Sequence, residues 1–207
     1  MKMIKGLLFT IPSLLFSSHS VETGLFYSIH HETGYCYKLG GIQINYEIGN
    51  SKGLKAQGKV RFSNDSDLLF FQANSEILYY IPFKSIEIVP FIGVQLVNHI
   101  VYQNEGDFGI LNRSYFPFGV GGVWKVGDLV LRAKIGHMQS ISHSFIVEAG
   151  DEFIGKKLWN KNAYLAELKI GYQLSDRAIA FFSSTWNQSY RGSLKHWTNE
   201  LTAQYNF

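Results

Sequence analysis

The sequence predicts an all-β fold: a transmembrane, antiparallel, up-and-down β-barrel of about ten strands, with eight or twelve as alternatives. Three observations support this prediction. The chain begins with an export signal, its last residues alternate between apolar and polar side chains, and similar alternation returns in earlier segments. Successive side chains of a strand point to opposite faces, so each such segment has one apolar and one polar face. A barrel with lipid outside and a polar interior requires this pattern.

Residues 1–20 have the layout of a secretory signal peptide. Two lysines precede an apolar stretch, and Ser18 and Ser20 supply small residues before the expected cleavage point, which follows Ser20. The apolar stretch is shorter than the roughly 20 residues that a spanning helix needs, and no later segment supplies such a run. We therefore expect residues 21–207 to form a single barrel domain.

Composition and charge agree with an exported β protein. Aromatic residues make up 15% of the chain and charged residues only 17%, and there are 20 glycines, which together indicate a β-rich chain with little solvating charge. Removal of Lys2 and Lys5 with the signal would lower the formal charge from +3 to +1. No basic patch is implied, so nucleic acid is not an expected partner. Cys36 is the single cysteine, so an internal disulfide is excluded.

Turn residues divide the remaining chain into ten predicted strands. The predicted strands are residues 24–31, 35–48, 54–62, 68–83, 86–102, 114–124, 129–139, 161–174, 177–190 and the segment after Lys195. Residues 103–113 are expected to form a loop, and residues 140–160 the longest irregular segment. Short connections at one end and longer ones at the other are typical of a barrel whose two termini face the periplasm.

The predicted strand at residues 35–48 shows the alternation most clearly. Ile42 and Ile44 share one face, and Gln43 and Glu47 share the other. Alternation is weaker in the fourth predicted strand, where Phe70 and Leu78 have the same parity as the polar residues at 72, 74 and 76. A β-bulge that shifts the register, or a small barrel with a packed interior, would each explain this mixture.

The charged side chains predicted to point inward are mixed in sign. They are Lys55, Lys59, Arg61, Arg132, Lys134 and Lys169 against Glu47, Glu76, Glu87, Glu167 and Glu200. Charges shielded from water must pair or be solvated, so we expect a cross-braced interior with at most a narrow pore. A soluble, lipocalin-like periplasmic binding barrel stays open as an alternative. In that case the apolar side chains would fill the centre and the lysines would face bulk water.

The C-terminal strand carries the first family resemblance. Leu201, Ala203, Tyr205 and Phe207 fall on one face, and the chain ends on an aromatic ring. Such a strand resembles the C-terminal assembly signal of Gram-negative outer-membrane β-barrels. The resemblance implies a bacterial outer-membrane location, contact with lipid and lipopolysaccharide, and recognition of these four residues by the barrel-assembly machinery. Aromatic girdles are expected at the strand ends. The residues expected in them include Trp124, Trp159, Tyr164, Tyr190, Trp197, Tyr205 and Phe207.

The segment that begins at His137 contains the candidate catalytic residues. With Ser140 and His143, it faintly resembles the outer-membrane phospholipases and lipid A deacylases, which place a His and a Ser on the lipid-facing wall so that the imidazole can deprotonate the hydroxyl. Those families carry the two residues two apart, whereas Ser140 is three residues from His137. A regular strand therefore places Ser140 on the opposite face, and we commit to no catalytic residue.

The same segment loosely resembles a group of uncharacterised exported proteins that bear His-x-Ser-Ser-His-Leu-Gly-Asp-Glu. His137, Ser140, His143 and residues 150–152 can be matched to that pattern only with extra residues inserted. The resemblance implies no particular activity.

No cofactor or metal site is predicted. The side chains that could be considered as metal ligands are His30, His31, His137, His143, Asp151 and Glu152. No pair among them has a recognised ligand spacing, and the adjacent His30 and His31 point in opposite directions on a strand. No glycine-rich phosphate loop leads from a strand into a helix, so nucleotide binding is not indicated.

The sequence thus predicts an integral outer-membrane β-barrel with a structural or surface-interaction role, whose external loops could meet a host or environmental ligand. Two alternatives remain open. One is an outer-leaflet lipid hydrolase that uses His137, and the other is the soluble binding barrel.

Overall fold

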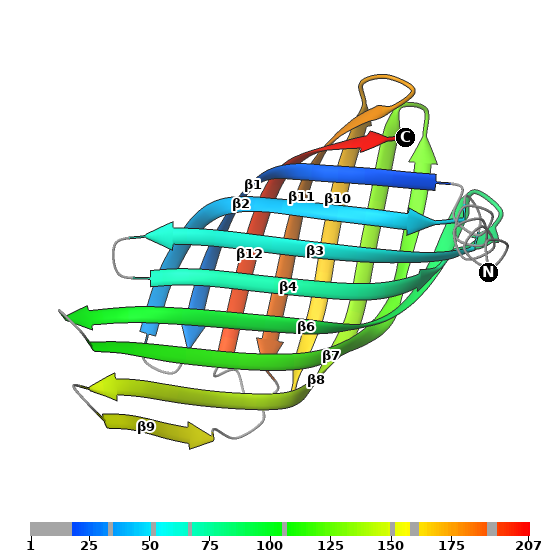
Figure 1. Cartoon of the computed structure of the whole chain (residues 1–207). Helices are drawn as coiled ribbons and strands as arrows, with labels where there is room; N and C mark the ends of the chain where they lie inside the picture. Colours follow the sequence, from blue (N-terminus) through cyan, green and yellow to red (C-terminus); the bar gives the residue numbers. More distant parts are fainter. Residues whose placement is uncertain are drawn as a thin grey trace, which may run out of the picture.

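The computed structural model describes residues 18–207 except 33–34, 51–52, 66–67, 105–106, 150–151, 158–161 and 190–193. The regular elements in these ranges are all strands (Figure 1). They are β1 (Ser18–Glu32), β2 (Tyr35–Gly49), β3 (Leu54–Asp65), β4 (Leu68–Tyr79), β5 (Ile81–Phe83), β6 (Ile86–Asn104), β7 (Asp107–Val126), β8 (Leu129–Ala149), β9 (Glu152–Lys157), β10 (Ala163–Gln173), β11 (Ala178–Ser189) and β12 (Leu194–Asn206).

The strands form one closed antiparallel barrel. Each wall strand pairs with its sequence neighbours, β1 pairs with β12, and β8 pairs with β10 past the short β9. Over the described residues the wall has ten strands, because β5 continues the line of β4 along β6, and β9 lies beyond the end of β10 on β8. The prediction of an up-and-down barrel of about ten strands is confirmed.

The first strand overlaps the predicted signal peptide by three residues. Ser18, His19 and Ser20 pair with the end of β2, and the His19 carbonyl accepts a hydrogen bond from the Phe207 N–H at 2.9 Å. Residues 1–17 lie outside the described part of the chain, so cleavage after Ser20 stays a prediction.

Two segments predicted to be irregular are strands. Most of residues 103–113 belongs to the ends of β6 and β7, and residues 140–149 continue β8, which then pairs with β9. As a result β6, β7 and β8 extend past β3 and β4 at one end of the barrel (Figure 1). The prediction failed because these residues lack a clean alternation. Beyond the apolar belt neither face of a strand has to be uniformly apolar, so pairing leaves no period of two in the sequence.

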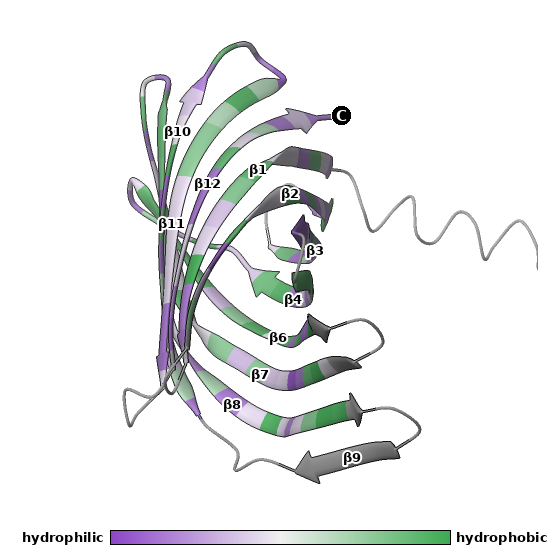
Figure 2. Cartoon of the chain, turned by 90° about the vertical axis from the view of Figure 1, so that its left-hand side faces the viewer, coloured by the Kyte–Doolittle hydropathy of each residue, from purple (hydrophilic) through white to green (hydrophobic). Residues whose placement is uncertain are grey.

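The outward faces of the wall strands are apolar. On the strand predicted most clearly, Ile42 is 55% exposed, whereas its neighbour Gln43 is 2% exposed. The same holds for Val60 beside Arg61 and for Ile170 beside Lys169. The hydropathy colouring alternates along the strands (Figure 2). The soluble alternative required the opposite arrangement, with apolar side chains inside and lysines in bulk water, and does not fit this wall.

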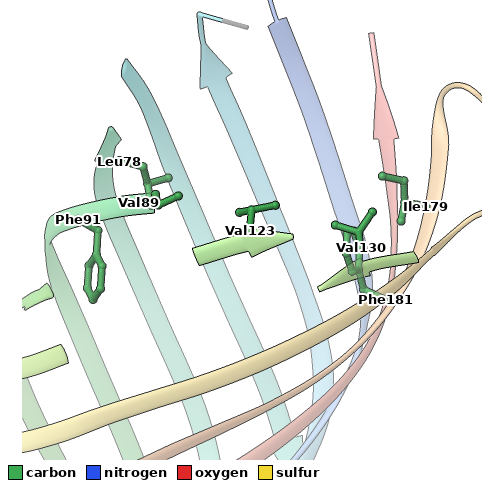
Figure 3. Close-up of a cluster of buried hydrophobic side chains, with 7 residues drawn as sticks. All are labelled: Leu78, Val89, Phe91, Val123, Val130, Ile179 and Phe181. Carbon is green, nitrogen blue, oxygen red and sulfur yellow. The ribbon is translucent and has the colours of Figure 1, made fainter. Parts of the chain in front are cut away.

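The interior is packed as well as polar. Phe70 and Leu78 are buried on the same face of β4 as Gln72 and Glu76. The pairing of β4 with β6 keeps one register from Leu68 to Leu78, so a packed interior, not a bulge, explains the mixed pattern there. Near the end that holds both termini, seven buried side chains from five strands form an apolar cluster (Figure 3). They are Leu78, Val89, Phe91, Val123, Val130, Ile179 and Phe181.

Two glycines make room for one of these rings. Phe91 of β6 lies in register with Gly119 of β7, which lies in register with Gly136 of β8. A Cβ atom would lie 2.9 Å from the Phe91 ring at Gly119 and 2.8 Å from it at Gly136. A Cβ atom would also overlap the Ile135 carbonyl oxygen at Gly119 and lie 2.6 Å from the Phe118 carbonyl oxygen at Gly136, so both the ring and the neighbouring backbone exclude a side chain here.

Candidate functional site

Next to the apolar cluster, toward the end of the barrel opposite the termini, the interior holds a layer of ion pairs. Glu200 of β12 is its most contacted carboxylate. It pairs with Arg61 and with Lys59, whose Nζ lies 2.7 Å from Oε2, and it accepts hydrogen bonds from Ser183 at 2.8 Å and Gln43 at 3.1 Å. Its side chain is 1% exposed, so nearly all compensation for its charge comes from these groups.

Three further carboxylates repeat this arrangement. Glu22 pairs with Lys169, Glu76 pairs with Lys134, and Glu47 lies 2.7 Å from the Nζ of Lys55. The pairs of Glu200, Glu22 and Glu76 join strands that are not neighbours in the sheet, as the mixed charges predicted, whereas Glu47 and Lys55 lie on the adjacent β2 and β3. They leave little continuous open space, which agrees with the expectation of at most a narrow pore.

A second set of buried and half-buried side chains fills the interior toward the end opposite the termini. His30 lies against His196 and His99, with ring centroids 4.1 and 5.5 Å apart, and its Nε2 is 2.7 Å from Ser28 Oγ. Tyr37 OH lies 3.3 Å from His99 Nε2. The buried apolar side chains Phe26, Leu39, Phe70 and Val97 pack in the same region. We call this set the histidine layer.

Sequence reasoning placed His99 and His196 inward but did not bring the histidine layer together. The alternation of inward and outward side chains along each strand indicates which histidines point inward, since His30 is buried and His31 is exposed. Their proximity depends on the stagger of β1, β6 and β12 around the barrel, which a single sequence does not give.

Arg113 was missed because it fell in an expected loop. It is 1% exposed on β7, its Nε donates a hydrogen bond to His143 Nε2 at 3.2 Å, and its Nη1 lies 3.5 Å from His196 Nε2. The strand register shifts by one residue where Ser114 and Tyr115 pair with β8, leaving Ile141 as the extra residue. This bulge turns His143 inward, toward Arg113.

The structure places His137 and Ser140 on opposite faces of β8. His137 lies on the outer wall, with its ring 5.2 Å from that of Phe118. Ser140 is buried inside, and its N–H donates to Asn162 Oδ1 at 2.9 Å. The bulge at Ile141 follows Ser140, so it does not bring the two side chains to one face.

Part of the candidate segment and of the predicted girdles lies outside the described residues. Gly150 and Asp151 are among these, as are Trp159 and Tyr190, and Glu152 is described only by its place in β9. Among the side chains that are described, no group of three or more His, Cys, Asp or Glu could hold a metal ion. No helix in the described ranges is long and apolar enough to cross a membrane.

Comparison with solved structures identifies the fold. The outer membrane protease OmpT from Escherichia coli matches 93% of this chain over 98% of its own length, with a TM-score of 0.66 and 10% identity. The translocator domain of the autotransporter NalP from Neisseria meningitidis matches 100% of this chain and 96% of its own, with a TM-score of 0.54 and 12% identity.

The chain has the fold of an outer-membrane β-barrel. This confirms the architecture that the C-terminal strand implied. At such low identity the likeness concerns the fold alone, so the protease activity of OmpT is not carried over. No protein-family model matches the sequence, and no curated protein matches it.

Proposed function

We propose that the protein is an integral β-barrel of the bacterial outer membrane with a structural or surface-interaction role and at most a narrow pore. The observation that carries this proposal is the orientation of the wall. Leu25, Ile135 and Leu201 are each more than 60% exposed on the outside, while the charged side chains pair inside. An apolar surface that surrounds a polar interior is stable in lipid and unstable in water.

The outer surface has the two aromatic borders that a membrane protein needs. One border contains Tyr27, Phe62, Phe71, Phe118, Tyr164, Trp186 and Trp197, and the other contains Tyr46, Tyr79, Phe83, Trp124, Tyr172, Tyr205 and Phe207. On β12 the belt runs from Trp197 to Phe207, which matches the about 9–11 residues of a tilted transmembrane strand. Past the first border the exposed positions become polar, as at His31, Lys38 and Lys195.

The connections support an orientation with both termini in the periplasm. At that end Lys84-Ser85 and Gly127-Asp128 are two-residue turns. At the opposite end β6, β7, β8 and β9 extend beyond the belt. Short periplasmic turns and long external segments are the usual arrangement. The extended strands and their connections are the surface on which lipopolysaccharide or a host or environmental ligand would be met.

The native cysteine offers a test of this topology. Cys36 is exposed on β2, next to the β1–β2 connection, and its Sγ lies 3.8 Å from His31 Nε2. A membrane-impermeant maleimide should label Cys36 on intact cells, and C36S should abolish the labelling. In a C36S/D176C variant the thiol lies in the exposed turn between β10 and β11 and should react only after the outer membrane is permeabilised. The reverse pattern would invert the orientation, and recovery of the mature protein in the soluble fraction would remove the membrane assignment.

We also propose that Leu201, Ala203, Tyr205 and Phe207 are read by the barrel-assembly machinery. All four are exposed on the outer face of β12, and the Tyr205 and Phe207 rings contact each other with centroids 5.0 Å apart. Because β12 pairs with β1 to close the barrel, this strand is also where assembly is completed.

The enzyme alternative is an outer-leaflet lipid hydrolase that uses His137. The position of His137 on the lipid-facing wall supports it, whereas the inward position of Ser140 leaves the imidazole without that nucleophile. We therefore expect purified wild-type barrel, H137A and the control H31A to release no fatty acid from phospholipid or lipid A. Release by wild type and H31A that is lost in H137A would establish the hydrolase instead.

A further inference from the structure

Arg132 of β8 differs from the other inward cations of the ion-pair layer. Lys55, Lys59, Arg61, Lys134 and Lys169 each contact a carboxylate oxygen. Within the described part of the chain Arg132 makes no ion pair, and its buried Nε has no hydrogen-bond partner. Its guanidinium lies 4.9 Å from the centroid of the Phe181 ring. Such a stack holds the plane of the group while leaving its N–H edge available.

Arg132 also lies where two cavities approach each other. A central cavity of about 100 Å³ is lined by the ion-pair layer and by Arg132. A second cavity of about 180 Å³, at the end that holds the termini, is lined by Arg132 together with Lys55, Lys125 and Phe207. The apolar cluster of Figure 3 contributes to both cavities, since Val123 lines the central cavity and Val130 lines the second one.

The central cavity contains further unused polar atoms. Thr185 Oγ1 and Asn187 Oδ1 are buried without a hydrogen-bond partner, and both residues line it. Asn45 also lines it, but its Nδ2 already donates to Glu22 Oε2 at 3.4 Å. A hydroxyl can donate, and an amide can turn its NH₂ toward a ligand. One water needs roughly 10–15 Å³ of such space, so the cavity has room for several waters or for a small ion.

The charges facing this space favour an anion near Arg132. Of the side-chain carboxylates that line the two cavities, Glu76 is held by Lys134, and Glu47 is held by Lys55 and lies 3.5 Å from the Tyr80 hydroxyl. Glu167 lines the central cavity without an ion pair among the described residues. It lies opposite Lys134 in the strand register, two positions along β10 from Lys169, which is the residue opposite Arg132. The planar fork of an arginine matches two oxygens of a carboxylate or phosphate.

We propose that Arg132 binds a small oxyanion of the phosphate or carboxylate class, which enters from the mouth at the terminal end of the barrel. Lys125 attracts the anion at that mouth, and Thr185 and Asn187 complete its hydrogen bonds. The histidine layer closes the other side, so the site is a blind pocket and not part of a through-going channel. The proposal needs the barrel interior but does not depend on a surface role.

The test uses the full mature barrel refolded in detergent, with inorganic phosphate and acetate as probes and chloride at equal ionic strength as the reference. Binding is followed by ³¹P line broadening and by the side-chain Nε–Hε signal of Arg132. Wild type should show saturable binding, and R132Q should bind at least tenfold more weakly. R132K, which keeps the charge without the fork, should fall between them. R177Q is the matched control, because it removes an exposed arginine from a turn at the same end.

Folding of each variant is checked by the mobility difference between unboiled and boiled samples on a gel. Should R132Q fail to fold, R132K and the wild-type Arg132 signal decide the question. Two results would overturn the proposal: an Arg132 signal that responds to phosphate no more than to chloride, which means that the cavity holds only water, or equal phosphate binding by wild type and R132Q.

Discussion

Replacing Glu200 with Gln should lower the free energy of unfolding of the barrel by about 3–5 kcal/mol, because it leaves the charges of Arg61 and Lys59 buried without their anion. The side chain of Arg61 is 6% exposed and that of Lys59 is 13% exposed, so water compensates little of the loss. The amide keeps nearly the volume of the carboxylate and can still bond Ser183. The effect measured is therefore that of the charge.

Glu167→Gln supplies the matched control. Glu167 also points inward, but within the described residues it makes no ion pair, so neutralising it should change the unfolding free energy by less than about 1 kcal/mol. Both variants are measured by urea unfolding in lipid vesicles, followed by tryptophan fluorescence. Equal effects of the two substitutions would show that the Glu200 contacts contribute nothing beyond the ordinary cost of losing an inward carboxylate.

The strands within the apolar belt could be predicted from the sequence because their two faces meet different environments. Lipid on one side and a polar interior on the other force a period of two, as at Ile42 and Gln43. Past the belt that constraint ends. Ile100, Ile110 and Ile146 lie in one row across β6, β7 and β8, and the sequence around them gives no alternation to mark the strands.

For the interior, the sequence predicted only the sign of the charges and which side chains point inward. Parity indicated that Arg61 and Glu200 point inward, but their contact joins β3 to β12 over an interval of 139 residues in sequence. Which inward residues meet depends on how far the strands are staggered when the sheet closes. The same reason hid the histidine layer, and the bulge at Ile141 hid the inward turn of His143.

Two groups of packed side chains, of different chemistry, lie on either side of the ion pairs of Glu22, Glu76 and Glu200. The apolar cluster with Phe91 and Phe181 narrows the barrel on the side of the termini, and the histidine layer closes it on the other. Breaking one ion pair would therefore destabilise the wall without opening a wide pore. This arrangement suits a barrel whose contribution to the cell is made at its outer surface and extended strands.

Leu25→Arg should cost about 2–4 kcal/mol of unfolding free energy in lipid vesicles, because it places a charge on the lipid face near the middle of the belt. Leu25 lies midway along the outer face of β1, with Leu201 and Ile42 beside it. Leu174→Arg is the control, since Leu174 lies at the rim near the termini and should lose only about 0–1 kcal/mol. The two leucines are 63% and 64% exposed, so exposure does not distinguish them. In a barrel surrounded by water both substitutions would be nearly neutral and alike. A large difference between them would thus be due to depth in a bilayer, and its absence would contradict the membrane assignment.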